Sequence, residues 1–200
     1  MYPVITISRE VGSGGHAIGE KVAEMLGIPF YDREIIEKVA QTTGYDAETV
    51  QSQGEYASAL QKYLGSKFYN GLYLGDAQDE IFYAQKIFIL EKAKEGPCVI
   101  VGRCADYILE EAKVPTLNVF IHADLEYRKK NVARQLNDEN APIEKILAGK
   151  AKGRKYYYRY YTDREWGDYQ NYHLNLDSGY LGEDTCAQLI AEIAKAKQVD

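Results

Sequence analysis

The fold of this chain is indicated by residues 4–16, which read VITISREVGSGGH. The stretch begins with four β-branched residues and passes into a loop with three glycines, and apolar residues at helical spacing follow at Ile18, Val22, Ala23 and Leu26. This order predicts a strand, a glycine-rich loop and a helix. The backbone N–H groups of such a loop and the positive end of the helix dipole can bind an anion. A tight turn with a purely structural role gives the same pattern, so the loop alone leaves both interpretations open.

The loop differs from a complete P-loop at two positions. In the pattern Gly-x4-Gly-Lys-Ser/Thr, the lysine reaches the terminal phosphates of the nucleotide and the hydroxyl binds magnesium. Aligned on the end of the strand, this chain has Arg9 for the first glycine and Gly14 for the second. Gly15 then replaces the lysine and His16 replaces the Ser/Thr. The sequence therefore predicts a phosphate cradle that lacks both reactive side chains.

Strand and helix patterns alternate along the rest of the chain. Apolar runs typical of buried strands lie at residues 98–102 and 117–121, and two further short strands are expected at residues 28–31 and 174–177. Helical patterns lie between and after them, at residues 32–40, 76–94, 106–112, 124–136, 142–161 and 182–197, with Asp32 and Asp124 as expected N-caps. This alternation predicts an α/β fold of the P-loop NTPase class, with a parallel sheet covered by helices on both faces. Ligands of such sheets bind beyond the carboxyl ends of the strands, where the glycine loop and Gly102-Arg103 both fall.

Composition excludes several classes of protein. With 46% hydrophobic residues, a chain of 200 residues can bury one good core. No stretch approaches the ~18 apolar residues of a membrane span, and the N-terminus lacks the basic region of a signal peptide. We therefore expect a cytoplasmic protein without membrane contact. The three cysteines form no Cys-x-x-Cys pair, so neither a disulfide framework nor a protein-held metal is predicted, and we expect them to be buried.

The charge of the chain is unevenly distributed. The net charge of -6 disfavours nucleic acid as a partner. Residues 128–164 nevertheless carry eleven basic and four acidic residues, a local net charge of +7. A basic segment in an acidic protein suits a small polyanion such as a nucleotide phosphate, although a solvated helical face explains it equally simply. The sequence has no pattern that specifies an oligomeric state.

Several segments closely resemble the cytidylate-kinase-like family of nucleotide kinases. They are residues 5–15, 26–34, 101–109, 156–168 and 171–172, so the resemblance extends over almost the whole chain. It implies a single P-loop kinase-like domain over residues 1–200, with a helical substrate-side region at 44–75 and a lid at 140–170. It also implies ATP and Mg²⁺ as cofactors and a small-molecule nucleotide as the substrate. The family commonly has an arginine at the position of His16 and an acid at that of His173.

The resemblance implies roles for three sets of residues. Those that would hold the donor phosphates are Gly12, Ser13, Gly14, Gly15 and His16, with Arg9 supplying the charge of the missing lysine. Asp32 and Arg103 would face the acceptor, with Arg103 binding its phosphate, and Asp106 would substitute for the acid that Cys104 replaces. In the lid, one or two of four basic residues would stabilise the transferring phosphoryl group: Lys152, Arg154, Lys155 and Arg159.

Three functions are compatible with this pattern. The first is a kinase that transfers the γ-phosphoryl group of ATP to a nucleoside monophosphate, with CMP or dCMP as the specific expectation. The second is a catalytically degenerate domain that binds a nucleotide or a phosphorylated metabolite without turnover, which the missing lysine favours. The third is a kinase for a small molecule that is not a nucleotide. A basic lid that closes over the phosphates favours an enzyme over a sensor.

Overall fold

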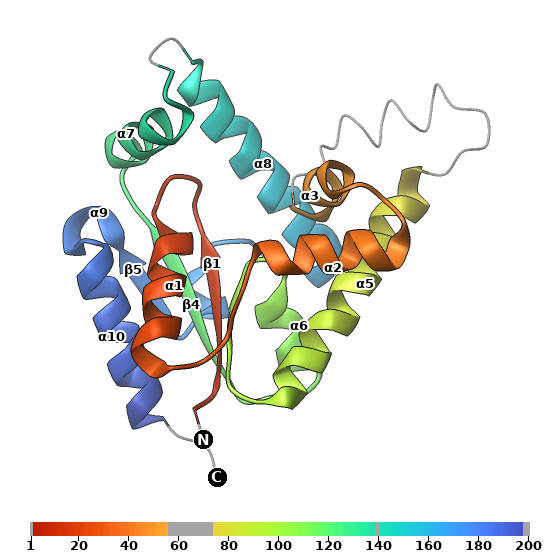
Figure 1. Ribbon diagram of the computed structural model, residues 1–200. Helices are drawn as coiled ribbons and strands as arrows, with labels where there is room; N and C mark the ends of the chain where they lie inside the picture. The colour runs from red at the N-terminus through yellow and green to blue at the C-terminus, as the bar shows by residue number, and fades with distance from the viewer. Residues whose placement is uncertain (1, 56–73, 139–140, 198–200) are drawn as a thin grey trace.

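The computed structural model describes residues 2–55, 74–138 and 141–197, and the side chains of residues 53–55 and 74–76 are left out of the description (Figure 1). Within this part of the chain, a sheet of five parallel strands has the order β2-β3-β1-β4-β5. The strands are β1 Val4–Arg9, β2 Phe30–Tyr31, β3 Val99–Val101, β4 Thr116–His122 and β5 Leu174–Asp177. The predicted parallel α/β sheet is confirmed.

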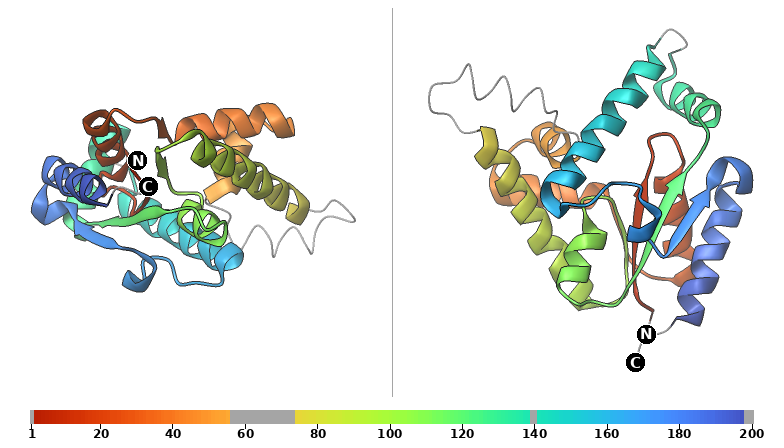
Figure 2. Two further views of the ribbon diagram at one scale, coloured as in Figure 1. Left: turned by 90° about the horizontal axis from the view of Figure 1, so that it is seen from below. Right: turned by 180° about the vertical axis from the view of Figure 1, so that it is seen from behind.

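Helices cover both faces of the sheet (Figure 2). Helices α1 Gly15–Leu26 and α10 Glu183–Ala196 pack together on one face. Helices α2 Arg33–Thr43, α5 Leu74–Glu95 and α6 Ala105–Glu111 cover the other. The remaining elements are α3 Ala47–Glu55, α7 Leu125–Leu136, α8 Ile143–Thr162, the 3-10 helix η1 Tyr169–Asn171 and α9 Ser178–Leu181.

Successive side chains of β1 point to opposite faces of the sheet, and the hydrophobic core accordingly has one half on each face. Ile5 and Ile7 are fully buried against the α1 and α10 face, whereas Val4 belongs to the cluster beneath α2, α5 and α6. Thr6 also points away from α1, and its hydroxyl donates to Oδ1 of the buried Asn118 at 2.8 Å. Because the side chains of Thr6 and Asn118 bond to each other, this face tolerates the polar pair inside a mainly apolar layer.

Most helix and strand expectations agree with the structure. The carboxylate of Asp124 accepts from the backbone N–H of Tyr127 at 2.8 Å and caps α7 as expected. Asp32 occupies the expected N-cap position of α2, but its side chain makes no capping hydrogen bond. The three cysteines are free and buried, as expected. Of the expected substrate-side region 44–75, residues 56–73 lie outside the described residues.

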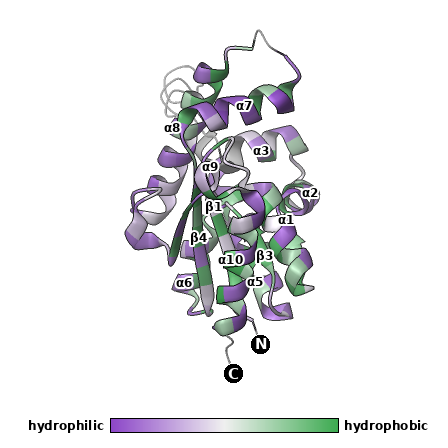
Figure 3. Cartoon of the chain, turned by 90° about the vertical axis from the view of Figure 1, so that its left-hand side faces the viewer, coloured by the Kyte–Doolittle hydropathy of each residue, from purple (hydrophilic) through white to green (hydrophobic). Residues whose placement is uncertain are grey.

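The carboxyl ends of the strands bring the expected site together. Strand β1 lies between β3 and β4, and the loop after it leads into α1 at the same edge from which Gly102 and Arg103 emerge. The hydrophilic helix α7 lies beyond this edge, above the largely apolar strands (Figure 3). No helix in the described part of the chain is both long and apolar enough to cross a bilayer.

Candidate functional site

The glycine loop is held in place by α7. Gly12 has a φ of 81°, and a Cβ atom added there would lie 2.6 Å from the carbonyl oxygen of Arg128. Only glycine permits both the backbone conformation and this close approach. The side-chain amide of Asn131 donates to the carbonyl oxygen of Gly12 at 2.9 Å. The position of the loop therefore depends on the packing of α7 against it.

Ser13 fixes the loop and does not line the cavity in front of it. Its side chain is fully buried, and its hydroxyl lies within hydrogen-bond distance of the carbonyl oxygens of Glu10 (2.9 Å) and Ile121 (3.2 Å). The hydroxyl of Ser178 donates to the carbonyl oxygen of Ser13 at 2.6 Å. The structure thus assigns the side chain of Ser13 a structural role, whereas the sequence grouped this residue with those that hold phosphates.

A cavity of about 340 Å³ opens in front of the loop, and we call it the loop cavity. It is lined by the loop, by the first turn of α1 and by side chains from α7, α8 and α10. Gly12, Gly14, Gly15 and His16 all contribute to this lining. Three basic residues from the helices reach it, namely Arg134, Lys150 and Arg154. The positive end of α1 and these side chains make the cavity suitable for phosphates.

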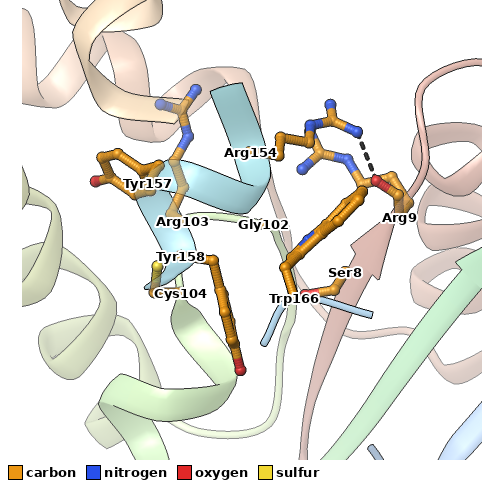
Figure 4. A pocket seen from close by; sticks show the side chains of 9 residues that line it. All are labelled: Ser8, Arg9, Gly102, Arg103, Cys104, Arg154, Tyr157, Tyr158 and Trp166. Carbon is orange, nitrogen blue, oxygen red and sulfur yellow. Dashed lines mark hydrogen bonds between the residues drawn. The ribbon is translucent and has the colours of Figure 1, made fainter. Parts of the chain in front are cut away.

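A second, smaller cavity of about 20 Å³ lies beside the first, and we call it the arginine cavity (Figure 4). Its lining includes three buried arginines, Arg9, Arg103 and Arg154, which are 9%, 2% and 6% exposed. Arg9 and Arg154 line both cavities. Nη1 of Arg154 donates to the carbonyl oxygen of Arg9 at 2.5 Å, which ties α8 to the end of β1. The remainder of the wall consists of Ser8, Gly102, Cys104, Tyr157, Tyr158 and Trp166.

Arg103 is the most costly of these side chains to bury. Gly102, Arg103 and Cys104 have consecutive φ values of 75°, 61° and 55°, a left-handed conformation that is strained for the two non-glycine residues. Within the described residues, Nε and Nη1 of Arg103 have no hydrogen-bond partner. A buried guanidinium with unused donors is destabilising unless an anion satisfies them. Strain and burial together therefore indicate an anion-binding role.

His16, Asp32 and Arg9 form a charged cluster at the edge of the loop cavity. Nδ1 of His16 lies 2.6 Å from one carboxylate oxygen of Asp32, and Nη2 of Arg9 lies 3.9 Å from the other. The hydrogen bond to Asp32 raises the pKa of His16 above 6.5, and partial burial of the imidazole opposes this rise. Asp32 lines neither cavity, and its carboxylate contacts His16 and Arg9 of the loop.

Four other predicted site residues lie away from the two cavities. Asp106 is buried behind Tyr158 and accepts a hydrogen bond from its hydroxyl at 2.8 Å. The side chains of Lys152, Lys155 and Arg159 are exposed on α8 and line neither cavity. Arg159 pairs with Asp163 and Glu165. Of the four basic residues expected in the lid, only Arg154 contributes to the cavities.

The buried carboxyl of Asp106 is expected to make the stability of the protein depend on pH. Burial raises the pKa of this carboxyl from 3.8 to about 6, although the hydrogen bond from Tyr158 opposes the rise. A raised carboxyl pKa stabilises the folded state fully below pH 3.8, and this contribution is lost as the pH rises through about 6. Asp106→Asn removes the ionisation, so we expect it to increase the free energy of unfolding by about 1–3 kcal/mol near pH 7.5, and by much less near pH 4.

Thermal unfolding at the two pH values measures this effect. The control is Glu111→Gln, which neutralises an exposed carboxylate at the end of the same helix and should change stability little at either pH. A decrease in the stability of Asp106→Asn near neutral pH would show that the ionised carboxylate is required by its surroundings.

The comparisons with known proteins agree with this geometry. The sequence profile of the cytidylate kinase-like family matches residues 4–180. An uncharacterized protein from Eubacterium ventriosum ATCC 27560 is 26% identical with a TM-score of 0.73, and the match covers 98% of this chain and 99% of the other. No protein with a curated description matches the chain.

Two solved kinase structures share the fold at low identity. Shikimate kinase from Acinetobacter baumannii, in complex with shikimate, is 14% identical with a TM-score of 0.54, and the match covers 100% of this chain and 97% of that one. A gluconokinase from Sinorhizobium meliloti 1021 is 15% identical with a TM-score of 0.54, and the match covers 97% and 94%. These similarities support the P-loop kinase architecture and leave the acceptor open.

Proposed function

Because the chain belongs to the cytidylate kinase-like family, we propose that it transfers the terminal phosphoryl group of ATP to a nucleoside monophosphate such as CMP or dCMP. The observation that supports this proposal best is the pair of adjoining cavities that share Arg9 and Arg154. The loop cavity suits the phosphates of the donor. The arginine cavity now has room for about one water molecule, and in this proposal it widens so that Arg103 can bind the phosphate of the acceptor.

In this proposal the protein supplies position and charge. The bond between the donor's terminal phosphorus and its bridging oxygen breaks, and a bond forms between that phosphorus and an oxygen of the acceptor phosphate. This oxygen is already ionised near neutral pH, so no protein base is needed. Arg9 and Arg154, which line both cavities, would stabilise the negative charge during transfer.

The loop fits the phosphates of ATP better than it fits a bound Mg²⁺. His16 stands where a P-loop has its metal-binding hydroxyl, and the hydroxyl of Ser13 is directed at backbone carbonyls. Among the described residues, no three His, Cys, Asp or Glu side chains are grouped as metal ligands. Any magnesium would therefore be bound by the nucleotide, and no step above depends on it.

Calorimetric titration tests the proposal. ATP and CMP are titrated separately, and a coupled assay then measures ADP release with both present. We expect both ligands to bind and ADP release to require the acceptor. Shikimate and gluconate, tested in the same assay, represent acceptors that are not nucleotides. Acceptor-dependent release with one of these, and none with any nucleoside monophosphate, would contradict the proposed acceptor.

A domain that binds nucleotides without turnover is the second candidate, because Arg9 occupies the space of the missing lysine. A Cβ atom at Gly15 would lie 2.5 Å from Cβ of Arg9, so no larger side chain fits beside it. Losing the lysine removes a contact to the transferring group, whereas binding of the ground state can persist. Binding of ATP with no ADP release for any acceptor would favour this candidate.

A further inference from the structure

His16 is held firmly at the loop position that normally carries a metal-binding hydroxyl. Its Nδ1 lies 2.6 Å from Asp32, and its ring packs edge-on against Phe30 with the ring centres 5.2 Å apart. Its side chain is 41% exposed and lines the loop cavity. The imidazole is therefore oriented by two contacts from β2 and the start of α2, while part of it faces the space in front of the loop.

The charges around His16 favour its protonated form. Asp32 and Glu20 face the imidazole, with Nε2 3.4 Å from a carboxylate oxygen of Glu20. Both carboxylates raise the pKa of His16, whereas Arg33 and partial burial lower it. Arg9 reaches the same Asp32 from β1. The carboxylates raise the pKa more than the opposing groups lower it, so an imidazolium is present at a higher pH than for a free histidine.

The acids that also line the loop cavity have cationic partners. The carboxylate of Glu10 lies 3.3 Å from Nε of Arg128, and that of Glu183 lies 3.7 Å from Nζ of Lys21. Arg9, Arg134, Lys150 and Arg154 add positive charge to the same cavity. Phosphate groups entering the cavity would thus meet an excess of cationic side chains, whereas a free divalent cation would be repelled by them.

We propose that the protonated imidazole of His16 takes the place of a loop-bound magnesium ion as the cation that faces the nucleotide phosphates. The inference rests on the proposed nucleotide-binding function. Two consequences follow for this site. A nucleoside diphosphate without metal binds at least as tightly as its magnesium complex, and its affinity decreases as the pH rises and His16 loses its proton.

ADP is the probe for the test, because it binds without phosphoryl transfer. Its affinity is measured by calorimetry in excess EDTA and in excess Mg²⁺, at about pH 6.5 and about pH 8.5. We expect the affinity in EDTA to equal or exceed that in Mg²⁺. We also expect it to decrease about tenfold between the two pH values, beyond any effect of the titration of the ADP phosphate itself.

Variants of His16 separate the two sources of pH dependence. His16→Gln removes the charge, so we expect about tenfold weaker binding at the lower pH and a flatter profile that retains only the titration of ADP. His16→Arg carries a permanent charge and should bind ADP at both pH values about as tightly as the wild type does at the lower one. Circular dichroism confirms that each variant is folded.

The outcomes distinguish this inference from the proposed function. ADP binding that weakens tenfold or more in EDTA, or a pH profile shared by the wild type and His16→Gln, would overturn the role of His16 and leave the nucleotide site intact. If ADP and ATP bind in neither buffer, the inference and the proposed function both fail.

Discussion

Replacement of Arg103 by leucine is expected to weaken binding of the phosphorylated acceptor strongly without reducing the stability of the free protein. Arg103 is 2% exposed, and two nitrogens of its guanidinium lack a hydrogen-bond partner within the described residues. Among the described residues nothing offsets the desolvation of these two nitrogens, and an apolar side chain of similar volume removes that cost. We expect the free energy of unfolding to be unchanged or to rise by about 1–3 kcal/mol.

The affinity for the acceptor, in contrast to the stability, is expected to fall. A guanidinium that binds a phosphate in a buried site makes charge-assisted hydrogen bonds, and removing it should weaken binding of CMP by about 100-fold or more. Calorimetry measures this affinity, and denaturant unfolding measures stability. Arg103→Lys retains the charge but not the fork of donors, so it should recover only part of the binding.

The matched control for stability is Arg159→Leu. The side chain of Arg159 is 54% exposed, and its ion pairs lie at the surface of α8, so its loss should change the free energy of unfolding by no more than about 0.5 kcal/mol. Unchanged CMP affinity in Arg103→Leu would reject Arg103 as the acceptor ligand. A loss of several kcal/mol would show that Arg103 stabilises the free protein.

Introducing a lysine at Gly15 is expected to disrupt the loop instead of restoring a complete P-loop. A Cβ atom at this position would lie 2.5 Å from Cβ and 2.8 Å from Cγ of Arg9. These atoms are close to the backbone of β1, so they cannot move aside as the end of a flexible side chain can. We expect Gly15→Lys to destabilise the protein by about 1–3 kcal/mol and to weaken ATP binding.

Restoring the glycine at position 9 should relieve this clash. Arg9 stands at the first glycine of the Gly-x4-Gly-Lys pattern, so Arg9 and the lysine of a complete P-loop are alternatives for the same space. A double-mutant cycle with Arg9→Gly and Gly15→Lys measures how far the two changes in the free energy of unfolding depart from additivity. We expect the double variant to be more stable than the sum of the single changes predicts, by more than about 1 kcal/mol.

Gly149→Ala is the control for adding a side chain. Gly149 lies inside α8 with nothing within 4 Å of the added Cβ, so the change should stabilise the protein by about 0.5–1 kcal/mol. If Gly15→Lys proves as stable as the wild type and binds ATP more tightly, then the space beside Arg9 is open and this account of the loop is wrong.

The sequence by itself determined the architecture. Apolar runs, helical spacing and capping residues involve only neighbouring positions, so the strands at 117–121 and 174–177 and the cap at Asp124 could be identified locally. The glycine loop was recognisable for the same reason, because its residues are consecutive. The limits of the 28–31 strand were less accurate, since only Phe30 and Tyr31 find a partner strand in β3.

Only the tertiary structure decided which side chains form the site. Neighbouring residues on a helix point in different directions, so the packing of α8 brings Arg154 to the loop and leaves Lys152 and Lys155 in solvent. Arg134 was visible only as part of a basic segment, and its place in the loop cavity depends on how α7 packs against Gly12. Asp32 pairs with His16, which is distant in sequence, instead of capping its own helix. Contacts between distant segments decide such roles, and local sequence patterns do not encode them.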